Sequence, residues 1–304
     1  MATVPTPLLY EQIDPAQCRV ISFPSLIWVF GGAIGQNTMR DVFWANTLQP
    51  QREEAWLPNL KRPEDFEDWW AFSGYTDILL FERDACLLAK IVVLFAESPG
   101  SYAELGAFAL DNAIVSKLLV IIPSKFREGD KQKSFLTLGP LARVENTDQD
   151  AVCVVGPDDA SKLEPHDIDS IFSSISQKFS KQRDSTHSLN VNDLSHRLLM
   201  MADVVDLLIV VHESHVQIEL HKMGLPVIDR DEMRRHAKLL NFLGFIHLRE
   251  RGHDRFLVRI QNSIPLASYT AVRGHKFDRL NFKIRRQEFV DSDARLRSML
   301  ERPK

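Results

Sequence analysis

The pattern of hydrophobic and polar positions in the first half of the chain predicts a parallel β-sheet. Three apolar runs lack the alternation expected of a strand with one solvent-exposed face: SLIWVF (25–30), AKIVVLF (89–95) and KLLVII (117–122). Stretches with helical spacing of apolar residues separate these runs, the first at 38–48. Apolar strands that alternate with helices are typical of a parallel sheet covered on both faces. We therefore expect an α/β domain with a Rossmann-like parallel sheet over residues 1–156.

The next region, 157–193, is rich in Ser, Asp, Lys and Gln, yet it keeps one apolar stripe at helical spacing. The stripe consists of Ile168, Ile171, Phe172, Ile175 and Phe179. This pattern predicts a linker that contains an amphipathic helix. The end of the region has the composition of a flexible joint, which closes with a helix N-cap at Asn192 or Asp193.

The last part of the chain, 194–304, has the pattern of a small helical domain with a hairpin. Apolar spacing and turn residues predict helices over 194–211, 216–222 and 229–243. Two strands, 245–248 and 254–260, then flank a glycine turn. This order of elements predicts a winged-helix domain.

Basic side chains lie on the predicted third helix and wing of this domain. They are Arg230, Arg234, Arg235 and Lys238 on the helix, and Arg249, Arg251 and Arg255 on the wing. Residues 194–304 carry about 20 Lys and Arg against 14 Asp and Glu, although the whole chain has a net charge of -4. Such a surface suits contact with DNA or RNA, but winged helices also dock on proteins, and both interpretations stay open.

The overall composition is that of an ordinary globular protein of 304 residues, 44% hydrophobic and 26% charged. The chain start lacks the features of a signal peptide, and no stretch approaches the roughly 20 apolar residues that span a bilayer, so we expect a cytoplasmic protein. Cys18, Cys86 and Cys153 lie far apart, which predicts buried free thiols. The histidine spacing favours no metal site, and neither a metal nor a cofactor is predicted.

The segment ESPGSYAELG (97–106), directly after the second apolar run, is the strongest candidate for chemistry. Ligands of open parallel sheets bind beyond the carboxyl ends of the strands, and Gly100 would let the backbone approach a ligand closely. The amides of Ser101 and Tyr102, which open a predicted helix, could hold an anion. Glu104, expected in the first turn, would be kept ionised by the helix dipole and suit a nucleophile or a stabiliser of an oxocarbenium-like sugar. The alternative is that Glu104 only favours the helix start.

The glycine loop after the first apolar run is the second candidate. Gly31 and Gly32 do not form the G-x-G-x-x-G fingerprint of dinucleotide-binding proteins. The two glycines could admit a ribose or a base, or they could form a tight turn, and both interpretations stay open. Arg40 and Asp41, close behind, would point either into the same cleft or into solvent.

An acidic and aromatic cluster follows at 63–70. Its carboxylates, Asp65 among them, could bind sugar hydroxyls, and Trp69 and Trp70 could stack on a base. For the two tryptophans we favour inward packing against the core. The G-x-S-x-G motif is absent, which speaks against a serine hydrolase.

Taken together, these motifs resemble those of the nucleoside deoxyribosyltransferase-like effectors of bacterial retrons. Retrons are anti-phage systems that pair a reverse transcriptase with a small branched RNA–DNA hybrid, the msDNA. The similar segments, in the same order, are VFGG (29–32), RPEDF (62–66), LFAESPGSYAELGAFA (94–109), KLLVIIPSKF (117–126) and KSFLTLGPL (133–141). The resemblance covers residues 25–145 closely and the winged helix in architecture only.

The resemblance implies that Glu104 is the catalytic carboxylate, which attacks the anomeric carbon, and that Gly100 matches the family's active-site glycine. One departure concerns Ser98, which stands where the transferases have an aspartate. The contact to a sugar hydroxyl would then come from Glu97 or Asp65. Its loss would fit a ribose substrate and hydrolysis in place of base exchange.

The function implied is that of an abortive-infection toxin that hydrolyses NAD, which is its substrate and not a cofactor. Gly31, Gly32, Gly100 and Ser101 would cradle ribose and phosphate while Glu104 acts at C1′. The winged helix would bind the reverse transcriptase or the msDNA and keep the toxin silent. One alternative is an N-glycosidase or deoxyribosyltransferase that acts on other nucleosides, nucleotides or nucleic-acid bases. Another is a non-catalytic, nucleotide-sensing DNA-binding regulator.

Overall fold

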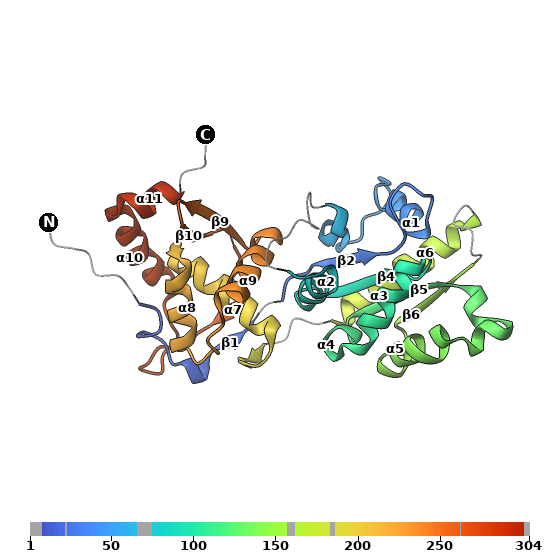
Figure 1. Ribbon diagram of the computed structural model, residues 1–304, viewed down its shortest axis with the longest axis horizontal. Coiled ribbons are helices and arrows are strands. Elements are labelled where there is room, and N and C mark those ends of the chain that lie inside the picture. Colours follow the sequence, from blue (N-terminus) through green and yellow to red (C-terminus); the bar gives the residue numbers. More distant parts are fainter. Residues whose placement is uncertain are drawn as a thin grey trace. The chain divides into compact units, whose positions relative to one another are not determined.

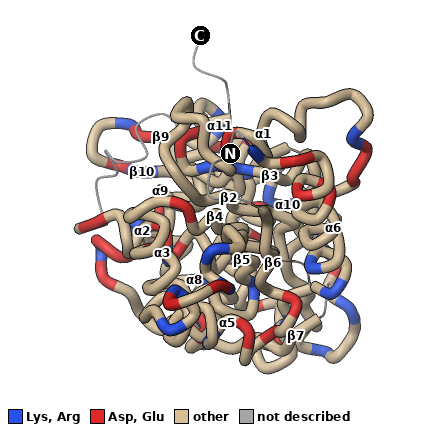
Figure 2. Tube along the Cα trace, turned by 90° about the vertical axis from the view of Figure 1, so that its right-hand side faces the viewer, with Lys and Arg blue, Asp and Glu red and all other residues tan. Residues whose placement is uncertain are grey.

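The computed structural model describes residues 8–21, 23–65, 75–156, 162–182, 186–261 and 263–300. These residues form two compact units (Figure 1). The sheet unit contains the described residues of 24–65 and 76–182, and the terminal unit contains those of 8–23 and 186–300 together with Tyr75. Acidic and basic residues are interspersed along the trace (Figure 2). Within the described ranges, no helix has both the length and the apolar character needed to span a membrane.

The sheet unit is built on a five-stranded parallel sheet. In spatial order its strands are β3 (Leu60–Lys61), β2 (Ile27–Phe30), β4 (Ile91–Phe95), β5 (Leu118–Pro123) and β6 (Val152–Val155). The predicted parallel sheet is therefore confirmed, and its three central strands are the three apolar runs. From β2 the chain adds β3 on one side and then returns to add β4 on the other. The order of strand addition reverses between β2 and β4, which makes this the topological switch point of the sheet.

Helices cover both faces of this sheet (Figure 1). One face carries α1 (Met39–Thr47) and α6 (Pro165–Lys181), whose Phe43 and Phe172 rings lie 5.4 Å apart over the apolar strand residues. The other face carries α2 (Ile78–Leu87), α3 (Pro99–Leu110) and α4 (Asn112–Val115). Here the rings of Phe30 and Phe108 lie 5.2 Å apart, and the Trp28 indole donates a hydrogen bond to the carbonyl oxygen of Ala85. Between β5 and β6 the chain forms a π-helical turn (Thr137–Leu141) and α5 (Ala142–Thr147).

The helix predicted inside the linker belongs to the sheet unit. Ile168, Ile171, Phe172 and Ile175 are all buried in the core that includes β2, β4 and β5. The apolar stripe therefore buries itself against the sheet instead of connecting two domains. The boundary between the units lies near residue 183, later than the expected end of the first domain at 156.

The terminal unit contains the predicted helices and hairpin, with one strand that the pattern did not show. Its elements are α7 (Leu194–Leu208), β8 (Val210–His212), α8 (Glu213–Lys222), α9 (Arg230–Phe242), β9 (Ile246–Arg251) and β10 (Asp254–Arg259). The helix expected to reach 211 ends at Leu208, because Ile209 adopts a φ of 66°. The residues that follow pair with β10, so the antiparallel sheet has the order β8-β10-β9.

Described segments from early and late in the chain come together in the terminal unit. Strand β1 (Arg19–Val20) pairs with β7 (His187–Ser188) and β11 (Ala267–Ser268), so the first described residues lie outside the sheet unit, in which we expected them. Two further helices, α10 (Arg279–Ser292) and α11 (Ala294–Leu300), were not expected from the sequence. Arg279 of α10 reaches the buried carboxylate of Asp203 on α7 at 2.8 Å and fixes α10 against the unit.

Candidate active site

The candidate site lies at the carboxyl ends of β2 and β4, the switch point of the sheet. Gly31 and Gly32 follow β2, and Glu97 follows β4. Neighbouring parallel strands end at the same edge, so these segments, far apart in sequence, meet in space. The place predicted for ligand binding therefore brings together the two segments that the sequence singled out.

The Glu97 side chain connects the segment after β4 with the loop after β2 and the start of α1. Its carboxylate accepts hydrogen bonds from the backbone amides of Gly32 (3.0 Å), Met39 (2.5 Å) and Arg40 (3.3 Å). The last two amides belong to the first turn of α1, where a negative charge is favoured. Burial still raises the pKa of Glu97, against the effect of these hydrogen bonds. The side chain proposed to contact a sugar hydroxyl is thus bonded to the backbone of its own chain.

The two loop glycines are required by this arrangement. A Cβ atom on Gly31 would lie 3.0 Å from a Glu97 carboxylate oxygen, and one on Gly32 would lie 2.7 Å from Cγ2 of Thr38. Contacts this close force neighbouring atoms to move. Close packing against the Glu97 carboxylate and the start of α1 therefore accounts for both glycines. Asp41 forms a capping box with Thr38 at the start of α1.

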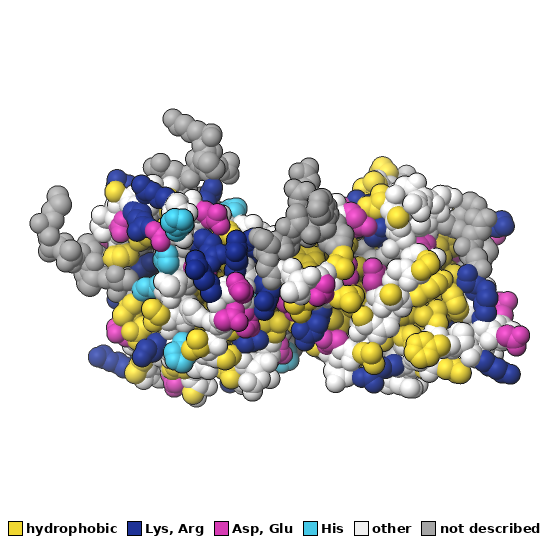
Figure 3. All heavy atoms as spheres, in the orientation of Figure 1, with side chains coloured by type: hydrophobic (Ala, Val, Ile, Leu, Met, Phe, Trp, Pro, Cys, Tyr) yellow, Lys and Arg dark blue, Asp and Glu magenta, His cyan; other side chains and the backbone are white. Residues whose placement is uncertain are grey.

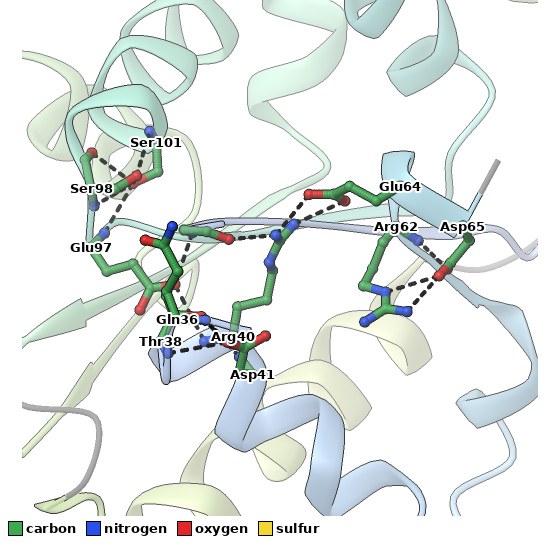
Figure 4. A network of polar contacts seen from close by, with 11 residues as sticks. Gln36, Thr38, Arg40, Asp41, Arg62, Glu64, Asp65, Glu97, Ser98 and Ser101 are labelled. Atoms are coloured by element: carbon green, nitrogen blue, oxygen red, sulfur yellow. Dashed lines mark hydrogen bonds and ion pairs between the residues drawn. The ribbon is translucent and has the colours of Figure 1, made fainter. Parts of the chain in front are cut away.

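Arg40 and Glu64 form an ion pair at the same edge (Figure 4). The Arg40 guanidinium donates to the two Glu64 carboxylate oxygens at 2.8 and 3.2 Å, and it also donates to the carbonyl oxygen of Gly32. The neighbouring Asp65 points away from this pair and binds Arg62 at 2.6 Å. Of the two described carboxylates in the cluster at 63–70, Glu64 therefore pairs with Arg40, whereas Asp65, the predicted one, does not. Phe66, Trp69 and Trp70 lie outside the described residues.

Ser98 and Ser101 cap the start of α3. The Ser98 hydroxyl accepts a hydrogen bond from the Ser101 amide, and the Ser101 hydroxyl accepts one from the Ser98 amide. The Tyr102 amide donates to the Ser98 carbonyl oxygen. The amides of Ser101 and Tyr102, expected to hold an anion, are thus engaged within the helix cap. Gly100 is exposed, and a Cβ atom there would meet only the Ser98 hydroxyl, at 3.9 Å.

Glu104 lies in the second turn of α3, because the helix already begins at Pro99. Its Oε2 atom is buried and has no hydrogen-bond partner in the described part of the chain. Burial raises the pKa of Glu104 to about 7, while Arg40 lowers it and Glu64 raises it. The expected preference for the ionised form, based on a place in the first turn, is therefore wrong. The buried setting yields a carboxyl group that changes charge near neutral pH.

Glu82 is a further carboxyl group that interacts with Glu104 and Glu64, and the sequence analysis did not identify it. It lies on α2 and is only 5% exposed. Its pKa is raised to about 8, chiefly by burial and in part by the negative charges of Glu104 and Glu64. Two neighbouring carboxyl groups with raised pKa values are a common arrangement for proton transfer in active sites. The position of Glu82 directly after the apolar run 78–81 was the sequence signal that could have identified it.

The basic residues predicted to bind nucleic acid or a partner lie on α9, β9 and β10. Figure 3 shows grouped Lys and Arg side chains on one face of the terminal unit. Arg255 differs from the others, because the Glu213 carboxylate pairs with it at 2.6 Å and its side chain is only 12% exposed. Arg251 reaches the Ser298 hydroxyl at 3.5 Å. The pKa of Lys238 is lowered, chiefly by burial and then by Arg234 and Arg255. The charges of these residues therefore act on one another.

The remaining predicted basic residues lie on α9 and β9. Arg230 is exposed at the start of α9, and Arg235 is partly buried further along this helix. Arg234 and Arg249 each have a buried Nε atom with no hydrogen-bond partner among the described residues. The three cysteines, Cys18, Cys86 and Cys153, are buried free thiols, as predicted.

Comparison with known proteins connects both units with retrons. A family model described as STM3845 retron effector protein matches residues 36–248. Over 80 residues the chain is 38% identical to a protein of retron Ec86 from Escherichia coli, provisionally named a ribosyltransferase/DNA-binding protein; the match covers 26% of this chain and 25% of that protein. A protein of the same description from retron Ec73 of Escherichia coli is 33% identical over 73 residues, which cover 24% of this chain and 22% of the relative. The chain thus matches about a quarter of the length of these relatives.

Proposed function

The chain belongs to the STM3845 retron effector protein family, and on that premise we propose that it is an anti-phage toxin whose sheet unit cleaves an N-glycosidic bond. The observation that carries the proposal is the Glu104 carboxyl group. It lies on the helix that follows β4 and is influenced by the charges of Arg40 and Glu64. One of its oxygens is buried without a hydrogen-bond partner among the described residues, and its pKa is raised to about 7. A nucleophile that must ionise near neutral pH has these properties.

In the proposed reaction, ionised Glu104 attacks C1′ of the sugar or stabilises the positive charge that develops there. The bond between C1′ and the base nitrogen breaks, and its electron pair leaves with the base. Water then attacks C1′, releases the sugar from Glu104 and gives up one proton. The net reaction adds the hydroxyl group of one water molecule to C1′ and releases the base together with one proton, which a neutral base takes up as it leaves.

The favoured substrate is NAD. Its nicotinamide is attached as a cation and leaves as a neutral molecule, so no proton donor is needed. A neutral base must be protonated as it leaves, and Glu82, which keeps its proton up to about pH 8, would supply that proton. The alternative substrates, other nucleosides and nucleotides, therefore depend on Glu82 in a way that NAD does not. Transfer of the sugar to a second base would use the same Glu104 chemistry.

The terminal unit is proposed to bind the other retron components. Its order of helix, strand, two helices and hairpin is that of a winged helix, and its basic face suits the phosphates of an RNA–DNA hybrid. The relatives from retrons Ec86 and Ec73 carry DNA-binding in their names, which supports this assignment. In the complex with reverse transcriptase and msDNA the toxin would be held inactive.

The test compares three forms of the chain produced in cells without the other retron components. Wild type and the exposed-site control Glu53→Gln should deplete NAD, release nicotinamide and arrest growth, whereas Glu104→Gln should do none of these. Mass spectrometry of cell nucleotides identifies the substrate. Glu104→Gln should still co-purify with reverse transcriptase and msDNA when all components are produced together.

Three outcomes contradict parts of the proposal. Toxicity retained by Glu104→Gln would overturn the mechanism. A wild-type chain that binds nucleotides without turnover, and that does no harm on overproduction, would indicate the nucleotide-sensing regulator. Depletion of a different nucleotide would keep the mechanism and change the substrate.

A further inference from the structure

Glu97 occupies a position that a substrate phosphate could otherwise take. In doubly wound sheets the turn after the first strand and the start of the next helix offer backbone amides to an anion. In this chain the corresponding amides, those of Gly32, Met39 and Arg40, all donate to the Glu97 carboxylate. The anion at this turn is therefore supplied by the protein itself.

The other group at this edge that could bind an anion is also taken. Arg40 directs both terminal nitrogens at Glu64, and its side chain is 3% exposed. At the start of α3, the Ser98 hydroxyl binds the Ser101 amide. Within the described part of the edge, the start of α1 and Arg40 are thus both neutralised by carboxylates of the chain.

We propose that Glu97 is a specificity-determining residue, a fixed internal anion that keeps substrate phosphate away from the turn between β2 and α1. A phosphate could bind there only by displacing Glu97 from three hydrogen bonds, or by lying beside a carboxylate of the same sign. The part of the substrate that reaches Glu104 is therefore uncharged or cationic, namely the sugar and base. Any phosphate of the substrate stays outside this turn. The inference rests on the proposed function for the nature of the substrate, but the occupied anion site can be tested without it.

Replacement of Glu97 by alanine should open a site that small anions can fill. We expect Glu97→Ala to lower the Tm by about 5 °C, because three amides lose a charged acceptor. Formate, which replaces the missing carboxylate, should raise the Tm of Glu97→Ala by several degrees relative to chloride at equal ionic strength. Inorganic phosphate should do the same. Wild type should show no such response. The matched control is Glu104→Ala, which removes another partly buried carboxylate of this edge whose Oε2 accepts no hydrogen bond.

The outcomes separate this inference from the proposed function, because none of these measurements involves turnover. If Glu97→Ala is destabilised but responds to formate and phosphate no more than Glu104→Ala does, the turn is not an anion site and the inference is overturned. It is also overturned if phosphate stabilises wild type as much as it stabilises the variant. Should Glu97→Ala fail to fold, phosphorus NMR of inorganic phosphate with wild type still decides. If wild type broadens the phosphate line and Glu97→Gln does not, the inference is contradicted. If wild type leaves the phosphate line unbroadened, the inference is supported.

Discussion

Arg40 and Glu64 form a two-pronged ion pair in which the arginine side chain is 3% exposed and the glutamate side chain 35%. The pair places one buried cation beside a group of carboxyls, and its two charges act on Glu104 in opposite directions. The pKa of Glu104 thus depends on a balance between burial, which raises it, and Arg40, which lowers it. Glu64 offsets part of the effect of Arg40 and fixes its guanidinium in place.

Loss of Arg40 should disturb both stability and chemistry. We expect Arg40→Met to reduce the free energy of unfolding by about 3–5 kcal/mol, because removing one partner of a buried pair leaves the other uncompensated. The partial exposure of Glu64 favours the lower end of this range. The same change should move the pKa of Glu104 upward from about 7. Urea denaturation and the pH dependence of the rate measure the two effects.

The double variant Arg40→Met/Glu64→Met serves as the control for this prediction. Since it removes both charges, it should recover part of the stability lost in Arg40→Met. A single variant as stable as wild type would show that the pair contributes little and that Arg40 does not hold the edge together.

The pH dependence of the reaction should reflect the raised pKa values of Glu104 and Glu82. Glu104 must lose its proton to act, so kcat/KM should rise with pH through about 7 for every substrate. For a neutral leaving base, the rate should fall again as Glu82 loses its proton near 8. The two groups interact, so the two limbs report the pair together. Initial rates from pH 5 to 10, with NAD and with a neutral nucleoside, provide the measurement.

Glu82→Gln should separate the two kinds of substrate. It should slow cleavage of neutral nucleosides and abolish the alkaline limb, while NAD cleavage keeps a rate close to that of wild type. Equal loss with both substrates would assign Glu82 a structural role in place of proton donation.

Stability should also respond to Glu82, with a sign set by its raised pKa. The folded state holds the proton more tightly than the unfolded state, so the stability that Glu82 contributes is fully present below about pH 4.5 and is lost as pH rises through about 8. Glutamine cannot ionise. Glu82→Gln should therefore match wild type near pH 4.5 and exceed its stability at pH 9 by several kcal/mol, with about 5 kcal/mol as the upper bound. Denaturation curves across this pH range measure how the free energy of unfolding changes with pH. Glu53→Gln, at an exposed position, should leave this pH dependence unchanged.

The sequence predicted the sheet well, because buried parallel strands are apolar on both faces. The three apolar runs became β2, β4 and β5, and the two segments chosen for chemistry did meet at the switch point. The helix at 165–181 was also predicted, but its stripe gave no information on what it packs against. Amphipathic spacing identifies a buried face and leaves the partner undetermined.

The details of the site depended on contacts between residues distant in sequence. Glu97 binds amides 58 and 65 residues away, and Arg40 finds Glu64 and not Asp65. Nothing in the local pattern distinguishes Glu64 from its neighbour. Glu104 shifted from the first turn to the second because Pro99 starts the helix, and burial then reversed the expected effect on its pKa.

The terminal unit offers a last prediction, on the basic face of α9 and β9. Arg234, Lys238 and Arg249 lie on these elements, and the charges of Arg234 and Arg255 lower the pKa of Lys238, which places like charges close together. Phosphates would relieve this repulsion. Each of Arg234→Ala and Arg249→Ala should therefore weaken binding of an RNA–DNA hybrid and reduce the slope of log K against log salt by about 0.7–0.9.

Two further arginines serve as controls for this prediction. Binding is measured by fluorescence anisotropy between roughly 50 and 200 mM salt, because phosphate contacts weaken strongly over this range. Arg273 is exposed in a loop elsewhere in the terminal unit, and Arg273→Ala should leave the salt slope unchanged, because its charge is not part of this face. Arg255→Ala should mainly destabilise the unit, because its partner Glu213 is buried. If Arg234→Ala and Arg249→Ala bind the hybrid as wild type does, the basic face contacts the reverse transcriptase instead. Loss of co-purification with the reverse transcriptase in the same two variants would then identify that surface.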